Sequence, residues 1–463
     1  MNQWLKHCRG GDVMKFLDLF AGAGGLSEGF VMAGFSPAAH IEMDKAACYT
    51  LKTRAAYHWL KEQGRLDIYH DYLHGRIDRN SFYAKIPQDV LESAMNYQMS
   101  KDNLEEIFDK IDGRLGDNRI NLIIGGPPCQ AYSLAGRSRD ANNMIGDERN
   151  YLYKIYAEFL RRYKPKYFLF ENVLGLLSAK EPDGTRHFDA MCRTFKECGY
   201  SVEAKIFLAS DYGVLQSRRR LILIGKLGDD HGFYPLVQRH PTEQDGICVS
   251  EIFNDLPPLH ANEGTPLPTK TRHYEGKYLY DAGIKEKDEE EVTLHYARYV
   301  NDHDKDIYRR VVEAWNRNQT RLKYTDLPKE MLTHKNTTSF LDRFSVVADN
   351  LSYAQTVVAH LSKDGHFFIH PDIKQNRSIT PREAARLQTF PDNFHFETST
   401  GKPAFGPIFR QIGNAVPVRL AYSLAKAINE CFVHPDSYQR DFDIYHEKKV
   451  KGNKEEAQTE LHF

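Results

Sequence analysis

The feature that most constrains this chain is a short apolar run at residues 122–124, followed at once by two glycines, two prolines and a cysteine (LIIGGPPCQ, residues 122–130). Short apolar runs bounded by Gly and Pro are typical of buried strands that end abruptly. In open α/β sheets, ligands bind beyond the carboxyl ends of such strands. The pattern therefore places Cys129 where a nucleophile would act, although a buried, inert thiol is the ordinary alternative for a single cysteine.

Length and composition limit the choice of protein class. The 463 residues suffice for two or three domains, or for one large core with a smaller appendage. The formal net charge is −1, so nucleic-acid binding would need basic residues gathered on one face. The seven cysteines are odd in number and form no CxxC pair, which argues against a disulfide framework and a zinc site. No signal peptide or long apolar run is present, so we expect a cytosolic protein without a membrane span.

A strand, a glycine turn and a helix are predicted near the start of the chain. Residues 14–20 read as the strand, and residues 21–30 (AGAGGLSEGF) as a turn that lets backbone approach a nucleotide closely. The dinucleotide pattern needs a third glycine where Ser27 stands, which weakens an NAD or FAD interpretation. A nucleotide without a pyrophosphate, or a purely structural turn, remains open. Glu42, at the end of the next strand, is placed to bind ribose hydroxyls, whereas Asp44 is expected to be a helix-start carboxylate.

Two further strands carry polar groups at their ends. Residues 166–170 form a predicted strand that leads into Glu171, which could be a catalytic acid or a helix-start charge. Residues 201–208 and 221–225 read as a hairpin. If the intervening residues are also extended, one face carries Gln216, Arg218 and Arg220. Because the flanking residues are apolar, we expect at least one of these arginines to face a site.

Other regions are less informative. Residues 45–118 read as mostly helical, with an insertion ahead of the Cys129 strand. Periodicity weakens over residues 227–344, where Pro, His and Tyr are frequent, which favours a separate smaller domain. Thr380 and Pro381 are the predicted N-cap and first residue of a helix, and a second helix is expected over residues 418–431.

Taken together, the motifs resemble those of the DNA (cytosine-5)-methyltransferases. DLFAGAGG, GGPPCQ, ENV, QSRRR, RSITPREAARLQ and QIGNAVP occur in the order found in that family, over about residues 14–226 and 352–430. The chain is similar to the compact bacterial members. It departs from the family in two places, because the short aspartate motif after the second strand is not evident and Leu215 stands where a proline is usual.

The resemblance implies an α/β fold, with a doubly wound, mostly parallel Rossmann-like sheet and a smaller inserted target-recognition domain. It implies a catalytic domain over residues 1–226, a recognition domain over residues 227–345, and a return to the catalytic domain over residues 346–463, ending in a charged tail. A monomer is expected.

The resemblance also implies an activity: methyl transfer from S-adenosylmethionine to carbon 5 of a flipped-out cytosine in double-stranded DNA. Cys129 would add to carbon 6, Glu171 would bind ring nitrogen 3 and the amino group, and Arg220, with Arg218, would hold the ring carbonyl. No metal is expected. The cofactor would be bound by Phe20, Ala21, Gly22, Gly24, Gly25, Leu26, Glu42, Met43, Pro127, Leu152, Asn414 and Val416.

Such an enzyme would act at the bacterial nucleoid, as part of a restriction-modification or other anti-phage system, with any cognate restriction endonuclease acting separately. Three alternatives stay open. An RNA or tRNA cytosine-5 methyltransferase of the same architecture shares much of the motif set. A catalytically silent DNA-binding protein is disfavoured by the intact Cys129, Glu171 and Arg220. A NAD-dependent oxidoreductase is disfavoured by Ser27.

Overall fold

A computed structural model describes residues 13–128, 151–180, 183–228, 234–333 and 341–434. The strands of its main sheet are β1 (Lys15–Leu19), β2 (Ser36–Glu42), β3 (Ala94–Asn96), β4 (Leu122–Gly125), β5 (Tyr167–Asn172), β6 (Tyr200–Leu208) and β7 (Arg219–Leu227). They lie in the order β3-β2-β1-β4-β5-β7-β6. The first five are parallel, and β7 pairs antiparallel with both β5 and β6. The predicted doubly wound, mostly parallel sheet is confirmed.

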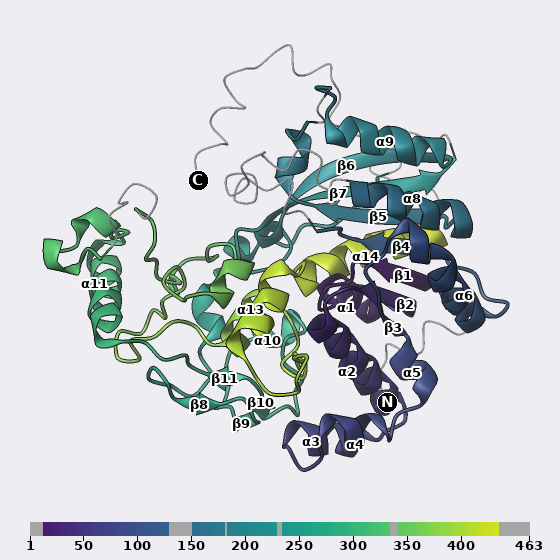
Figure 1. Cartoon of the computed structure of the whole chain (residues 1–463). Helices are drawn as coiled ribbons and strands as arrows, with labels where there is room; N and C mark the ends of the chain where they lie inside the picture. Colours follow the sequence, from purple (N-terminus) through teal and green to yellow (C-terminus); the bar gives the residue numbers. More distant parts are fainter. Residues whose placement is uncertain (1–12, 129–150, 181–182, 229–233, 334–340, 435–463) are drawn as a thin grey trace.

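Helices cover both faces of this sheet (Figure 1). The helices concerned are α1 (Gly25–Met32), α6 (Leu104–Leu115), α8 (Leu152–Tyr163), α9 (His187–Glu197) and α14 (Val418–Val433). Leu17 and Ile123 face a core shared with α6, α8 and α9. Phe16 and Ile124 face the opposite core, shared with α1 and α14. The covering is possible because alternate apolar residues of each central strand point to opposite faces.

The predicted insertion forms a small helical unit between β2 and β3. It consists of α2 (Lys45–Glu62), α3 (Leu66–Leu73), α4 (Arg79–Tyr83) and α5 (Gln88–Glu92). Its separate apolar cluster joins Tyr57 and Leu60 of α2 to Tyr69 and Phe82 of the following helices. The chain therefore adds this unit without interrupting the central sheet.

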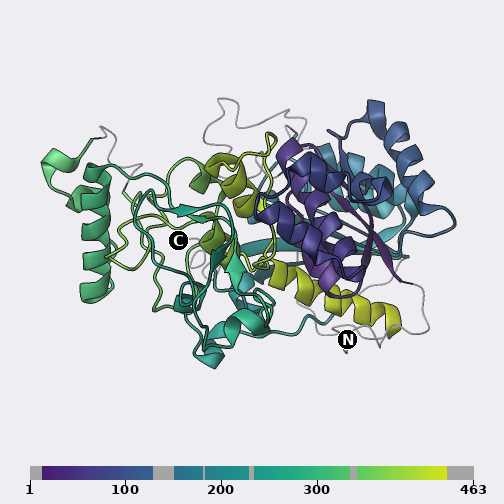
Figure 2. The same ribbon diagram turned by 90° about the horizontal axis from the view of Figure 1, so that it is seen from below.

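The smaller part of the molecule extends from the sheet toward α11, which both views place at the far end (Figures 1 and 2). Its elements are β8 (Gly264–Thr265), β9 (Thr269–Lys270), α10 (Tyr278–Asp281), β10 (Glu291–Val292), β11 (His295–Tyr296), α11 (Asp302–Asn318), α12 (Pro381–Leu387) and α13 (Phe405–Asn414). One core joins apolar residues between 249 and 294 to α12 and α13. A second core lies beneath α11. The return to the main sheet is made by α14, which packs along α1.

Buried charges bind α12 to the smaller core. Thr380 caps the helix and forms a capping box with Glu383, as the predicted N-cap requires. Arg386 donates to Asp255 at 2.6 Å and to Asp392 at 2.6 Å. Glu383 also accepts two hydrogen bonds from Arg377. The charged residues in and just before α12 therefore hold this helix to Asp255 and Asp392, which lie on neighbouring segments.

No helix in the described ranges is long and apolar enough to cross a membrane.

Buried histidines should make the fold sensitive to acid. His40, His295 and His370 are buried, and burial lowers the pKa of each, to about 4 for His40 and about 3 for His370. Between those values and about pH 6.5, the folded chain binds fewer protons than the unfolded chain. Stability should therefore be full above about pH 6.5 and fall with the pH, by about 1 kcal/mol each for His40 and His370 at about pH 5.5. Urea unfolding curves at about pH 7.5 and 5.5 measure the loss.

His370→Asn should reduce this pH dependence, whereas His360→Asn should not, because the His360 side chain is 49% exposed. Identical unfolding midpoints at the two pH values would contradict the prediction.

Candidate active site

The loop between β1 and α1 lies at the carboxyl edge of the sheet, where the strand order reverses between β1 and β4. Ligands bind at such reversals in doubly wound folds. Phe20, Gly22 and Gly24 have left-handed backbones, with φ of 60°, 56° and 84°. This conformation is unusual for a phenylalanine, so the surrounding structure fixes the loop. The Ala21 amide donates to the Ile41 carbonyl at 3.1 Å and ties the loop to β2.

Glu42, the last residue of β2, holds the same loop through its side chain. Its carboxylate accepts the Gly22 amide at 2.8 Å and the Asp44 amide at 2.7 Å. Burial raises the pKa of Glu42, while these amide donors lower it. A carboxylate has about four acceptor positions, so Glu42 can bind further hydroxyl groups. Asp44 caps α2, as expected of a helix-start carboxylate.

Asn96 lies beside Glu42 and was not apparent from the sequence. It ends β3, which pairs with β2 so that Asn96 stands opposite Glu42. Its side-chain amide donates to the main-chain carbonyls of Glu42 and Met43 at 2.9 Å and 3.0 Å. A strand of three residues gives no alternation long enough to detect, so no pattern marked this position.

The end of α13 and the start of α14 complete this edge. A Cβ on Gly25 would lie 2.4 Å from the Val416 carbonyl oxygen, so the start of α1 packs directly on the segment before α14. Met43 is 55% exposed. The other predicted cofactor positions are Leu26 and Pro127, which are buried, Leu152, which is half-buried, and Asn414, which is exposed.

Glu171 and Arg220 meet at the same edge of the sheet. The Arg220 Nε lies 2.6 Å from the Glu171 Oε1, and the two side chains are 14% and 13% exposed. Because β7 runs antiparallel to β5, its first residues lie beside the last residues of β5. A Cβ on Gly126 would lie 2.4 Å from the Glu171 Oε2, so the glycine leaves room for the carboxylate.

Arg218 occupies a different environment. Residues 216–218 precede β7, so the expectation that Gln216, Arg218 and Arg220 share one strand face is wrong. The Arg218 guanidinium is buried and donates to the carbonyls of Val357 at 2.6 Å and Gly413 at 3.0 Å. Gln216 accepts the Val357 amide at 2.8 Å. These residues join backbone segments that are distant in sequence.

Cys129 lies outside the described residues, as do residues 130–150. The structure places the strand that leads to it: Gly125 of β4 pairs with Phe170, next to Glu171. Residues 126–128 then continue from the edge that holds Glu171 and Arg220.

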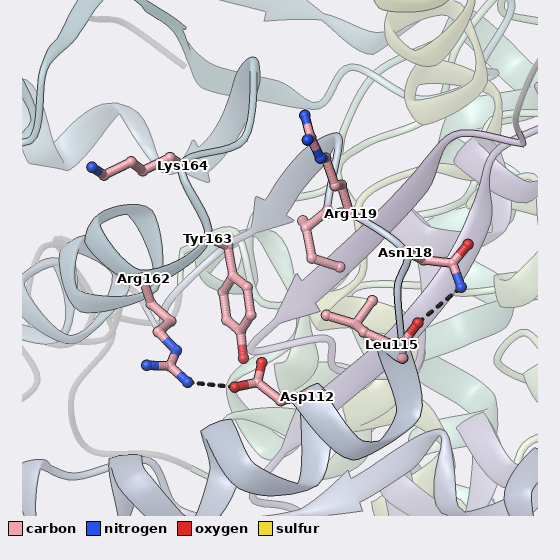
Figure 3. A pocket seen from close by; sticks show the side chains of 9 residues that line it. Asp112, Leu115, Asn118, Arg119, Arg162, Tyr163 and Lys164 are labelled. Carbon is pink, nitrogen blue, oxygen red and sulfur yellow. Dashed lines mark hydrogen bonds and ion pairs between the residues drawn. The ribbon is translucent and has the colours of Figure 1, made fainter.

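A hollow of about 480 Å³ lies elsewhere, at the opposite edge of the sheet (Figure 3). It is lined by the ends of α6 and α8, where Arg162 pairs with Asp112. The strands β4 and β5 begin here, so the hollow is not part of the site at their carboxyl ends.

Comparison with known sequences identifies the family. The C-5 cytosine-specific DNA methylase family matches residues 14–72 and 85–430. The chain belongs to this family. Membership makes the protein a DNA (cytosine-5)-methyltransferase and implies S-adenosylmethionine as the methyl donor. The unmatched residues 73–84 fall in the helical insertion, from the last residue of α3 through α4.

This methyltransferase is 37% identical to the type II methyltransferase M.Bpa9945I of Bacillus paralicheniformis, over 90% of this chain and 99% of that protein. It is 29% identical to the type II methyltransferase M.DdeI of Desulfomicrobium norvegicum, over 90% of this chain and 89% of that protein. A crystal structure described as a DNA modification methyltransferase encoded within a prophage (E. coli) aligns with a TM-score of 0.57 and 22% identity, over 91% and 99% of the two chains. That likeness concerns the fold.

Gly126→Ala should displace the Glu171 carboxylate and lower kcat by about 10²-fold, the usual effect of a misplacement near 1 Å at a reacting centre. Gly113→Ala is the matched control, because no atom of the described residues outside its own helix lies within 4 Å of a Cβ at that position. Methyl transfer to DNA and thermal unfolding should be measured for both variants. Full activity in Gly126→Ala would show that the position of Glu171 is not critical.

Proposed function

We propose that this methyltransferase modifies cytosine within a specific double-stranded DNA sequence, and that Cys129, Glu171 and Arg220 carry out the chemistry. The observation that supports this most directly is the ion pair between Glu171 and Arg220, which lies against Gly126, three residues before Cys129. A carboxyl and a guanidinium fit the polar edge of a cytosine ring, which offers ring nitrogen 3, an amino group and a carbonyl.

The proposed mechanism depends on covalent activation of the ring. Carbon 5 of cytosine is a weak nucleophile, and a Cys129 thiolate adding to carbon 6 makes it electron-rich. Glu171 hydrogen-bonds ring nitrogen 3 and the amino group, while Arg220 holds the ring carbonyl as charge develops. When bound, S-adenosylmethionine would supply an electrophilic methyl group to carbon 5, and S-adenosylhomocysteine would leave. A base then removes the carbon-5 proton, and the bond to Cys129 breaks as the aromatic ring is restored.

The edge formed by β1, β2 and α13 suits the proposed cofactor. Glu42 is a buried carboxylate with capacity to accept hydrogen bonds from ribose hydroxyls. Among the described residues, nothing lies within 4 Å of a Cβ placed on Gly22, so its backbone can approach a ligand there. Met43 exposes an apolar thioether next to Glu42, which suits contact with an adenine ring. The remaining predicted positions stand on neighbouring elements of the same edge.

We assign target recognition to residues 227–345 and catalysis to residues 1–226 together with residues 346–463. The target carbon is inaccessible within a duplex, so the cytosine must be flipped out. The helices α12 and α13 share a core with residues 249–294, which supports their use as a rigid base for the recognition segment. We assign a monomer, because one chain supplies every proposed element.

Relatives named as type II methyltransferases suggest the biological setting. We propose that this enzyme protects bacterial DNA in the cytoplasm as the modification partner of a separate restriction endonuclease. Methylation of tRNA is the second candidate. Assaying both nucleic acids with the same preparation separates the two, and bisulfite sequencing of DNA from a host that expresses the chain identifies the target sequence.

Cys129→Ala should abolish methyl transfer while leaving the fold intact, because the thiol supplies the covalent step. DNA with 5-fluorocytosine at the target position should form a stable adduct with the wild-type enzyme, since fluorine cannot leave as a proton does. Mass spectrometry of the complex detects the adduct. An active enzyme that forms none would exclude covalent catalysis.

Replacing residues 227–345 by the corresponding segment of a related enzyme of known specificity should transfer the target sequence. The major groove distinguishes all four base pairs, and this segment carries Arg, Asn and Gln side chains suited to reading them, including Arg317 and Gln319. Bisulfite sequencing of host DNA reads the outcome. A folded, active hybrid that still methylates the original site would refute the domain assignment.

A further inference from the structure

Ser27 stands where a dinucleotide-binding turn would have its third glycine, and it makes a specific buried contact. Its hydroxyl lies 2.7 Å from the Nε2 of His40. Ser27 belongs to the first turn of α1, and His40 lies in β2, two residues before Glu42. The bond therefore joins the helix that follows the glycine loop to the strand that carries the proposed ribose ligand.

Two titratable side chains, Asp18 and His40, lie at this hydrogen bond, and burial favours the neutral form of each. Asp18 of β1 is 1% exposed and lies beside Ser27. Burial raises the pKa of Asp18 well above its usual value, and a weaker interaction with the Ser27 hydroxyl lowers it. Burial also lowers the pKa of His40 to about 4. A neutral imidazole leaves one ring nitrogen as donor and the other as acceptor, so it can exchange a directed hydrogen bond with the serine.

The position of α1 leaves little freedom on its other side. A Cβ on Gly29 would lie 2.5 Å from the Ala421 Cβ of α14, and one on Gly25 would lie 2.4 Å from the Val416 carbonyl oxygen. Residues 416–421 therefore pack closely against one side of α1 and limit its movement away from the sheet. The Ser27 side chain lies on the side of α1 that faces β2.

We propose that the hydrogen bond between Ser27 and His40 sets the distance between the glycine loop and Glu42, and that both are positioning residues for S-adenosylmethionine. The proposal rests on the methyl donor assigned above. Among the described residues, three hydrogen bonds join the loop region to β2: the Ala21 amide to Ile41, the Gly22 amide to Glu42, and Ser27 to His40. The first two lie in the loop itself. The third joins a side chain of the helix that follows the loop to β2.

The loop would change its position relative to Glu42 if this contact were lost. The Gly22 amide contributes one of the hydrogen bonds that orient the Glu42 carboxylate. A shift of α1 relative to β2 would weaken that bond and turn the carboxylate from its present direction. Binding of the donor should suffer, while the groups at the Glu171 and Arg220 pair stay in place.

Ser27→Ala tests this in the full-length protein, because it removes the hydroxyl without adding volume. The Kd for S-adenosylhomocysteine, measured by calorimetry without DNA, should rise about fivefold, the effect of one net hydrogen bond. The KM for S-adenosylmethionine should rise similarly, while kcat at saturating donor changes by less than about twofold. Ser201→Ala is the control, since that hydroxyl donates to the Gly228 carbonyl at 2.9 Å on the outermost strand, β6.

A double-mutant cycle with His40→Gln separates positioning from general loss of stability. The two changes should be non-additive in Kd, because they remove the same contact. Ser27→Ala and Ser201→Ala should lower the melting temperature by similar amounts, but only the former should weaken donor binding. A wild-type Kd in Ser27→Ala would overturn this proposal alone. A wild-type protein that binds neither S-adenosylmethionine nor S-adenosylhomocysteine would overturn the proposed donor as well.

Discussion

The reversed direction of β7 is the constraint on which the candidate active site depends. Parallel strands all end at one edge of a sheet, so an arginine at the start of a further parallel strand would stand at the opposite edge from Glu171. Because β7 is antiparallel to β5, its second residue, Arg220, reaches the Glu171 carboxylate. The hairpin of β6 and β7 therefore brings a positive charge to an edge formed otherwise by the ends of parallel strands. Gly126 keeps the space beside Glu171 clear.

Long-range contacts between backbone and side chains hold this edge together. The segment before β7 lies beside residue 354, and Gln216 and Arg218 bond to the main chain around Val357. Arg218 also reaches Gly413, close to the end of α13. Buried arginines with several main-chain partners are costly to remove, since an unpaired carbonyl stays desolvated. Such motif residues hold segments of backbone that are distant in sequence together beside the candidate active site.

The sequence predicted the sheet and its main strands because alternating or continuous apolar runs bounded by glycine or proline are strong local signals. The cap at Thr380 and the helix of residues 418–433 followed from equally local rules. β3 was missed, since three residues carry no periodicity. The environment of Arg218 was missed because its partners are main-chain carbonyls 139 and 195 residues away, which leave no trace in side-chain pattern. The hydrogen bond between Ser27 and His40 could not be predicted for a similar reason, because it depends on how α1 packs on β2.

The packing of α14 has a consequence for how the chain is made on the ribosome. The core between α1 and the sheet includes Leu420, Leu424 and Ile428, which are translated long after β1. Until those residues have emerged, the apolar face of β1 and β4 has no final cover. During synthesis, this face of the sheet stays exposed until α14 has been translated, and exposed apolar surface favours aggregation and chaperone binding. Among the described residues, α14 is the helix that completes the packing of α1 against the sheet.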